Sequence, residues 1–217
     1  MKRIIIFGAG GFGRETAQLI EDINLKKEDW VIEGFVDDAP ELKNKIVNGY
    51  KVLGGAEYLN NYTDEVFITC PIGYANVKKK VIDKVSNSNV VFANLIHPSA
   101  IISGTVELGQ GIIIQSNCVV TTNVRLGNHV HVNPQCGIAH DSIIGDYTSL
   151  FWNVNVSGNV KIGEGCVLGS KSVIIQGKSI GNWSTIGSGS NVINDIPSNC
   201  TAVGNPAKPI KYNLGAL

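Results

Sequence analysis

From residue 96 onward, an aliphatic residue recurs at every sixth position of the chain without interruption. Neither the two-residue period of an ordinary strand nor the 3.6-residue period of a helix produces this spacing. An 18-residue period runs through the same region, because glycine directly follows every third aliphatic residue over much of it. The aliphatic series is Ile96, Ile102, Leu108, Ile114, Val120, Leu126, Val132, Ile138, Ile144, Leu150, Val156, Ile162, Leu168, Ile174, Ile180, Ile186 and Val192, and the main glycine series is Gly109, Gly127, Gly145, Gly163 and Gly181.

A six-residue unit used three times per 18-residue turn describes a triangular prism of short parallel strands, with coils stacked about 4.8 Å apart. The aliphatic side chains fill the narrow interior, and glycine and small residues allow the corners. Small residues also occupy most positions four after the aliphatic one, with Lys178 and Ile196 as departures. The pattern over residues 96–197 resembles the hexapeptide-repeat, left-handed parallel β-helix.

Residues 1–95 follow a different rule, in which strand-like and helix-like segments alternate. Such a βαβ order predicts a parallel sheet with helices on its faces. We therefore expect a Rossmann-like α/β domain over residues 1–95, followed by the β-helix domain and its tail over residues 96–217. The expected strands are Lys2–Phe7, Trp30–Val36, Val66–Cys70 and Val90–Leu95, and the expected helices are Arg14–Ile23 and Tyr74–Val85.

Composition narrows the class of protein. Hydrophobic residues make up 43% and charged residues 17% of the 217 positions, which is typical of a packed globular chain. Eighteen basic residues balance eighteen acidic ones, so neither a nucleic-acid nor a membrane-surface partner is expected. The opening apolar run stops at Gly8, too short for a secretory signal. Five cysteines without metal-binding spacing favour free thiols in the cytoplasm.

The first chemical candidate is the GAGGFG turn at residues 8–13, between an expected strand and an expected helix. Backbone N–H groups around Gly10, Gly11 and Phe12 could approach a phosphate there, and Asp37 and Asp38 after the second strand could bind a ribose or base. Alone, this motif would suggest NAD, or merely a tight turn without ligand. Ninety-five residues supply barely one mononucleotide half, so a nucleotide-sugar fits the size better.

His140 is the second candidate, since it falls two positions after the interior Ile138, at a corner where its ring should point outward. A lone surface histidine usually has no role, but the acidic neighbour Asp141 could fix its tautomer, directly or through water or another subunit. Zinc is not expected, because the ligand spacing of hexapeptide-type zinc carbonic anhydrases places Gly104 and Gly145 where histidines would be needed.

A third signal is the string VGNPAK at residues 203–208, which could simply end the solenoid. Together with IIIFGAGGFGRE, FVDD, NLIHPSA, HVNPQCGIAHDSIIGDY and VSGNVKIG, it makes the chain similar to the sugar O/N-acyltransferases of the hexapeptide-repeat class. That family includes sialic acid O-acetyltransferases and nucleotide-aminosugar N-acetyltransferases. The resemblance implies a trimer that binds acetyl-CoA as co-substrate between adjacent prisms and a nucleotide-sugar in the first domain.

The resemblance also implies roles for individual residues. His140 would be the general base of a direct acetyl transfer, with Asp141 beside it, Asn133 in the active site and the Gly158 N–H near the thioester oxygen. The implied acetyl-CoA contacts are Ser149, Gly158, Ser170, Ser188 and Lys208 in the β-helix and its tail, and the implied nucleotide-sugar contacts are Gly10, Gly11, Phe12, Asp37, Asp38, Gly73 and Lys78 in the first domain.

Two positions depart from the family pattern. Ser149 stands where relatives often carry a histidine, and Phe12 replaces the histidine of a GGHG turn. Both departures leave the identity of the acceptor sugar open. N-acetylation of a nucleotide-linked amino sugar is the leading interpretation. The alternatives are O-acetylation of sialic acid or another sugar hydroxyl, and a trimeric nucleotide-binding scaffold without catalysis.

Overall fold

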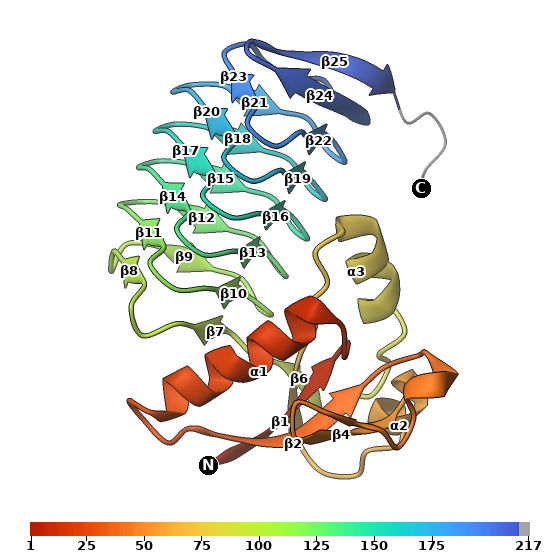
Figure 1. The fold of residues 1–217 in the computed structure, drawn as a ribbon. Coiled ribbons are helices and arrows are strands. Elements are labelled where there is room, and N and C mark those ends of the chain that lie inside the picture. The colour runs from red at the N-terminus through yellow and green to blue at the C-terminus, as the bar shows by residue number, and fades with distance from the viewer. Residues whose placement is uncertain (213–217) are drawn as a thin grey trace. The chain divides into compact units, whose positions relative to one another are not determined.

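The computed structural model describes residues 1–212 and contains two compact units, Met1–Pro98 and a second unit that begins at Ser99 (Figure 1). This division falls three residues after the boundary expected between residues 95 and 96. The last five residues of the expected second domain lie outside the described residues. Within residues 1–212, no helix combines the length and apolarity that a membrane crossing requires.

The first unit contains a twisted sheet with the strand order β3-β4-β2-β1-β5-β6. Its strands are parallel except for the edge strand β3, which runs antiparallel to β4. In the interior strand β1, Ile4, Ile5, Ile6 and Phe7 are buried, as expected for a continuous apolar run covered on both faces. The strands are β1 (Lys2–Phe7), β2 (Trp30–Val36), β3 (Ile46–Val47), β4 (Tyr50–Gly54), β5 (Val66–Thr69) and β6 (Val90–Phe92). The short strand β7 (Leu95–Ile96) does not belong to this sheet.

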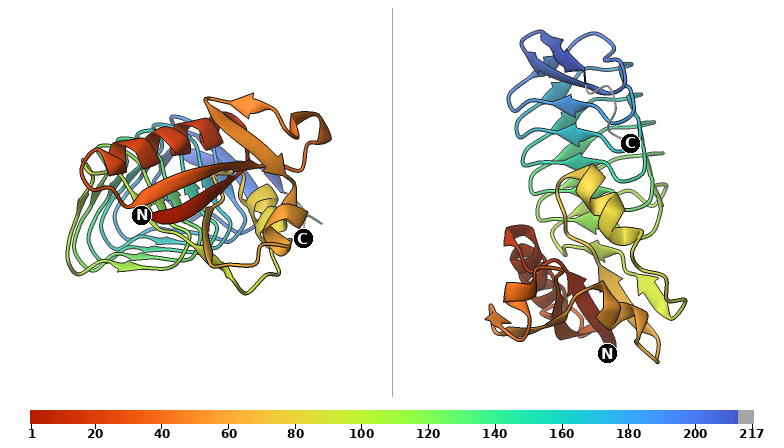
Figure 2. Two further views of the ribbon diagram at one scale, coloured as in Figure 1. Left: turned by 90° about the horizontal axis from the view of Figure 1, so that it is seen from below. Right: turned by 90° about the vertical axis from the view of Figure 1, so that its right-hand side faces the viewer.

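Helices cover both faces of this sheet. The crossover β1-α1-β2 and the crossover β5-α3-β6 run in opposite directions across the sheet, so right-handed connections place α1 and α3 on opposite faces (Figure 2). Helix α1 begins three residues earlier than expected, because the glycine turn already forms its first turn. The helices are α1 (Gly11–Asn24), the 3₁₀ turn η1 (Pro40–Leu42), α2 (Ala56–Asn60) and α3 (Ala75–Ile82).

The second unit is a left-handed parallel β-helix whose two-residue strands form three sheets, one on each side of a prism. Sheet I contains β8 (Ile101–Ile102), β11 (Val119–Val120), β14 (Gly137–Ile138), β17 (Asn155–Val156), β20 (Val173–Ile174) and β23 (Asn191–Val192). Sheet II contains β9 (Glu107–Leu108), β12 (Arg125–Leu126), β15 (Ile143–Ile144), β18 (Lys161–Ile162) and β21 (Ser179–Ile180). Sheet III contains β10 (Ile113–Ile114), β13 (His131–Val132), β16 (Ser149–Leu150), β19 (Val167–Leu168), β22 (Thr185–Ile186), β24 (Cys200–Gly204) and β25 (Ala207–Tyr212).

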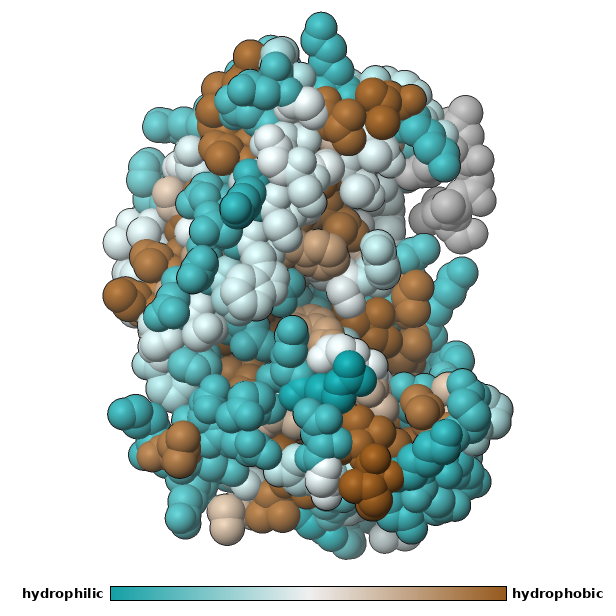
Figure 3. Space-filling view, in the orientation of Figure 1, coloured by the Kyte–Doolittle hydropathy of each residue, from teal (hydrophilic) through white to brown (hydrophobic). Residues whose placement is uncertain are grey.

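Every strand from β8 to β23 ends on a member of the six-residue aliphatic series, so that series is confirmed position by position. Up to β23, partners in neighbouring coils are 18 residues apart, as in Ile114 beside Val132 and Val132 beside Leu150. The hairpin of β24 and β25 then ends the stack. On the side shown in Figure 3, hydrophilic and neutral residues cover most of the prism and apolar side chains form separate clusters.

The corners use backbone geometry that the glycine pattern did not reveal. From Gly111 to Gly189 one residue in six adopts a positive φ, usually asparagine or glycine. The glycines of the 18-residue series are not those residues. They allow close stacking instead: a Cβ at Gly109 or Gly145 would run into the backbone of the next coil.

Small polar residues at the fourth position link consecutive coils from within. The hydroxyl of buried Thr148 donates to the Gly163 carbonyl at 2.9 Å and accepts from the Cys166 N–H at 3.0 Å. Ser142 makes the same pair of bonds with Ser157 and Val160. Cys118 and Cys136 occupy this position in adjacent coils, and all five cysteines are free and buried.

We expect Thr148→Val to destabilise the β-helix by roughly 2–4 kcal/mol. Valine has nearly the same shape but leaves a buried N–H and a buried carbonyl without partners. Thermal denaturation followed by circular dichroism measures the loss, with Thr185→Val on the outside of β22 as the control. Equal melting temperatures for the two variants would contradict this role for the buried hydroxyl.

Candidate active site

The glycine turn of the first unit contains two kinds of glycine. Gly8 has a φ of +123°, and a Cβ at Gly13 would collide with the carbonyl of Gly8, so these two are required by the fold. A Cβ at Gly10 would meet nothing within 4 Å. Gly10 and Gly11 are exposed at the start of α1 and at the carboxyl end of β1, where parallel sheets of this type bind ligands.

The two expected acidic residues hold backbone around this turn. Asp37 accepts from the N–H of Ala9 at 2.9 Å and from the N–H of Ala39 at 3.0 Å. Asp38 accepts from the N–H of Ala56 at 2.9 Å and pairs with the Lys84 ammonium at 2.6 Å. Partial burial alone would raise the pKa of Asp38, but the bonds from Lys84 and Ala56 hold it below its ordinary value.

Lys78 on α3 lies inside the first unit and not on its surface. Its side chain is fully buried, and this burial lowers the pKa of its ammonium to about 7, against an opposing effect of Cys70. Burial likewise raises the pKa of the Cys70 thiol to about 12. Of the other expected contacts, Phe12 and Gly73 are half-buried. A ligand at the glycine turn would therefore meet Gly10, Gly11 and Phe12 directly, whereas the fully buried Lys78 offers it no exposed surface.

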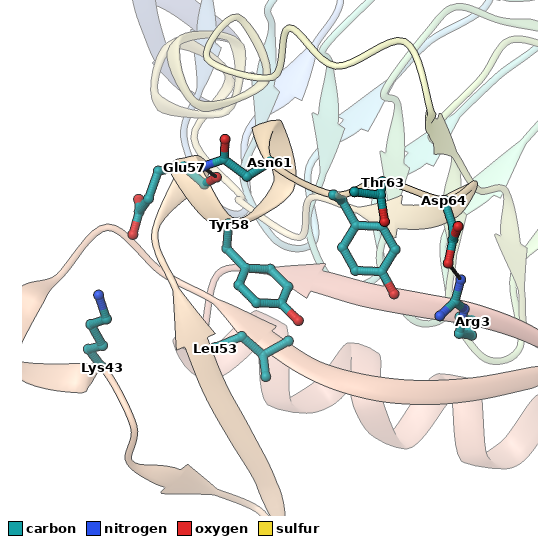
Figure 4. Close-up of a pocket in the computed structure, with 9 residues that line it drawn as sticks. Arg3, Lys43, Leu53, Glu57, Tyr58, Asn61, Thr63 and Asp64 are labelled. Carbon is teal, nitrogen blue, oxygen red and sulfur yellow. Dashed lines mark hydrogen bonds and ion pairs between the residues drawn. The ribbon is translucent and has the colours of Figure 1, made fainter.

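A surface hollow of about 490 Å³ lies on the first unit, where Arg3 of β1, Leu53 of β4 and Tyr58 of α2 are among its lining residues (Figure 4). Arg3 stands near the amino end of β1, whereas the glycine turn follows its carboxyl end. The Arg3 guanidinium is paired with Asp64 at 3.1 Å and with Glu33 at 3.5 Å. The hollow is lined by Arg3, Lys43, Leu53, Glu57, Tyr58, Asn61, Tyr62, Thr63 and Asp64, none of which the sequence singled out.

In the second unit, His140 and Asp141 lie in the turn between β14 and β15, at the edge where sheets I and II meet. Half of the His140 side chain is exposed, and its Nδ1 lies 2.8 Å from Oδ2 of Asp141. Asp141 adopts a left-handed φ of +60°, a conformation that aspartate tolerates. The two neighbours therefore bond directly, so neither a water molecule nor another subunit is needed to join them.

This bond fixes the protonation pattern of the imidazole. The hydrogen bond with His140, followed by that with Asn123, lowers the pKa of Asp141, so the carboxylate is ionised at neutral pH and can only accept. The Nδ1–H of His140 must then be the donor, so in the neutral imidazole Nε2 is the nitrogen that carries no proton. Asn123 was not predicted, although it lies 18 residues before Asp141 and hence one coil below it.

Space for the bare nitrogen is provided by Gly158, one coil above His140. A Cβ at Gly158 would collide with Nε2 of the His140 ring, so any other residue would displace the imidazole. A trough of about 260 Å³ lies on the outer face of sheet I and extends to Ala139, next to His140. It runs over Gly137, between Val119 and Asn155. The imidazole therefore stands beside an open groove on its own prism face.

The remaining expected residues of the β-helix do not join His140. Asn133, Ser170 and Ser188 lie in turns between sheets III and I, at a different edge of the prism. Ser149 is fully buried in strand β16 of sheet III, and Lys208 lies in β25 next to Val203. Within residues 1–212, no group of three or more histidine, cysteine or acidic side chains is arranged to hold a metal ion.

Comparison with known proteins gives one family match and several full-length relatives. Residues 3–85 match the family model described as the PglD N-terminal domain. GDP-perosamine N-acetyltransferase of Escherichia coli O157:H7 is 31% identical over 214 residues, which is 95% of each chain.

Solved structures match over both units. A histidine-to-asparagine mutant of perosamine N-acetyltransferase from Caulobacter crescentus, in complex with CoA and GDP-perosamine, has a TM-score of 0.86 at 25% identity and covers 97% of this chain and 98% of its own. The acetyltransferase domain of PglB from Neisseria gonorrhoeae, in complex with acetyl coenzyme A, has a TM-score of 0.85 at 27% identity and covers 96% of this chain and 99% of its own.

The burial of Lys78 predicts a pH-dependent cost in stability. Its pKa of about 7 in the folded chain lies below the ordinary lysine pKa of 10.5, so the unfolded chain binds more protons between these values and stability rises with pH across this window. Lys78→Met should remove the cost and raise the melting temperature at pH 7 by at least about 4 °C, the effect of roughly 1 kcal/mol.

Thermal melts of both proteins from pH 7 to 9.5 test this, with the exposed Lys80→Met on the same helix as the control. A lower melting temperature for Lys78→Met than for Lys80→Met at pH 7 would show that the buried ammonium stabilises the fold instead.

Proposed function

The chain belongs to the hexapeptide-repeat family of sugar acyltransferases, and on that premise we propose that it N-acetylates a nucleotide-linked amino sugar with acetyl-CoA. The observation that carries the proposal is the His140–Asp141 pair, which leaves a bare imidazole nitrogen beside an open trough. The first unit supplies an open glycine turn at the start of α1, which suits the diphosphate of a nucleotide-sugar.

The chemistry assigned to His140 is that of a general base. Its Nε2 removes a proton from the sugar amine as the amine lone pair forms the C–N bond at the thioester carbonyl. The C–S bond then breaks, and its electron pair leaves with the thiolate of CoA. The N–H of Gly158 is assigned to the developing oxyanion. No covalent acyl-enzyme is required, because a shared groove brings both substrates together and supplies the proximity effect.

We assign the active site to two copies of the chain in a homotrimer. Asn133, Ser170 and Ser188 lie at the edge between sheets III and I, whereas His140, Asp141 and Gly158 lie at the edge between sheets I and II. One face of the prism separates the two groups, so one chain cannot place both on the same substrate. A threefold arrangement brings one edge of each prism against the other edge of its neighbour.

The free thiols and the nucleotide-linked acceptor favour the cytoplasm as the location of this reaction. O-acetylation of sialic acid or another sugar hydroxyl is the alternative at the same site, since Ser149 and Phe12 both depart from the family pattern. A hydroxyl depends on His140 more strongly than an amine does, because an amine is already nucleophilic.

The direct test is thiol release from acetyl-CoA with a panel of UDP-, dTDP- and GDP-linked amino sugars, alongside free sialic acid. We expect release with an amino-sugar nucleotide and a loss of at least about 10²-fold in turnover in His140→Ala, the usual contribution of a positioned base. Lys161→Ala on the outside of sheet II serves as the control variant.

Release with sialic acid alone would replace N-acetylation by O-acetylation. Unchanged turnover in His140→Ala would remove the histidine from the mechanism. Absence of acetyl-CoA binding in calorimetry would favour the non-catalytic scaffold and reject the enzyme.

The composite site predicts complementation between two inactive variants. His140→Ala and Asn133→Ala should each be inactive alone, but mixed trimers should recover about a third of wild-type activity, because one of the three interfaces in each mixed trimer pairs an intact His140 with an intact Asn133. Co-expression with two affinity tags isolates the mixed trimers, and a co-expressed His140→Ala/Asn133→Ala double variant with wild type corrects for dilution. No recovery in the mixed trimers would contradict the two-chain site.

A further inference from the structure

The histidine and its carboxylate belong to a longer line of side chains along the edge between sheets I and II. Asn123 lies one coil below Asp141 and donates its amide N–H to Oδ1 of Asp141 at 3.1 Å. The other carboxylate oxygen, Oδ2, accepts from Nδ1 of His140 at 2.8 Å. Each oxygen of Asp141 thus has one partner, and the two partners come from different sides.

This arrangement matters because Asp141 is exposed at the surface of the prism. A solvent-exposed carboxylate can rotate about its side-chain bonds and accept from water, and would then leave the neighbouring imidazole free to change tautomer. A donor held against Oδ1 opposes that rotation and keeps Oδ2 towards Nδ1. Asn123 supplies such a donor, and its neutral amide adds no charge next to the imidazole.

Asn123 is itself held in place by the coil below. Its backbone N–H donates to the Thr105 hydroxyl at 2.9 Å, and that hydroxyl lies 3.1 Å from the hydroxyl of Ser103. Asn123 also adopts a left-handed φ of +58°, matching the +60° of Asp141 directly above it. The backbone of Asn123 is therefore held at this corner, which fixes the position from which its side-chain amide reaches Asp141.

We propose that Asn123 is a positioning residue for the general base: through Asp141 it holds His140 in the tautomer that leaves Nε2 unprotonated. This inference rests on the proposed function, since it assigns Asn123 to the same reaction. It goes beyond that function by extending the catalytic pair to a third residue from a different coil.

The tautomer of His140 can be observed without any substrate. The chain has four histidines, so ¹⁵N-histidine labelling gives a simple spectrum in which His140→Gln identifies the His140 signals. At a pH where the imidazole is neutral, the wild-type protein should show a protonated Nδ1 and a bare Nε2. Asn123→Ala should show a mixture of both tautomers, because Asp141 is free to turn away.

Activity gives a second and separate measurement. Asn123→Ala should lower kcat about 3- to 10-fold and leave the KM for acetyl-CoA unchanged. Asn123→Asp removes the amide donor and places a second carboxylate beside Asp141. His140 remains the hydrogen-bond partner of Asp141 on the other side. The added negative charge repels the Asp141 carboxylate, so Asn123→Asp should lower kcat at least as much as Asn123→Ala.

The chain contains a matched control at another edge. Asn128 donates its amide N–H to Oδ2 of Asp146 at the same distance of 3.1 Å and across the same 18 residues. Oδ1 of Asp146 accepts from the backbone N–H of Asn128 and not from an imidazole. Asn128→Ala should therefore lower the melting temperature at least as much as Asn123→Ala, with no change in kcat or in the His140 spectrum.

The possible failures are distinguishable. An unaltered His140 tautomer in Asn123→Ala, or an equal loss of kcat in Asn128→Ala, would overturn the positioning role. A wild-type protein without acetyl transfer would reject the proposed function, and the tautomer spectrum would still show whether Asn123 controls the imidazole.

Discussion

Up to Val192, each strand residue of the β-helix lies directly above the one 18 positions earlier, and backbone hydrogen bonds between coils enforce that register. Val132 pairs with Ile114 below and Leu150 above, and the same step recurs along all three sheets. The interior, the corners and the His140–Asp141 pair all depend on it. Gly158 leaves room for the His140 ring because it is one coil above, and Asn123 reaches Asp141 because it is one coil below.

The sequence predicted the β-helix strand by strand, because a period of six leaves one inward aliphatic residue in every strand. In the first unit it predicted β1 and β2 at their observed bounds, since both are long apolar runs. It missed β3, β4 and α2, which have two to five residues each and are too short to show a period. These short elements are held by their neighbours in the sheet more than by local propensity.

Knowledge of the site from sequence was uneven for a related reason. The corner position of His140 and its acidic neighbour follow from counting along the repeat. The backbone bonds of Asp37 to Ala9 and Ala39 do not, because they join loops with no common period. The burial of Lys78 could not be predicted by counting either, because it depends on how α3 packs in the first unit. Asn123 lay within reach of the same counting, since its distance from Asp141 is one full coil.

The glycines that follow the aliphatic residues have a consequence for how such a chain can change in length. They fit only where the next coil passes closely over them, and each corner residue stands on the corner below. Removal of six residues would carry every later segment to a different side of the prism, so residues would no longer stack on equivalent positions of the coil below. Removal of 18 residues would take out one complete coil and leave the stacking of all other coils unchanged. Evolution can therefore lengthen or shorten this solenoid in whole layers, and the amount of prism above His140 can vary while its surroundings stay the same.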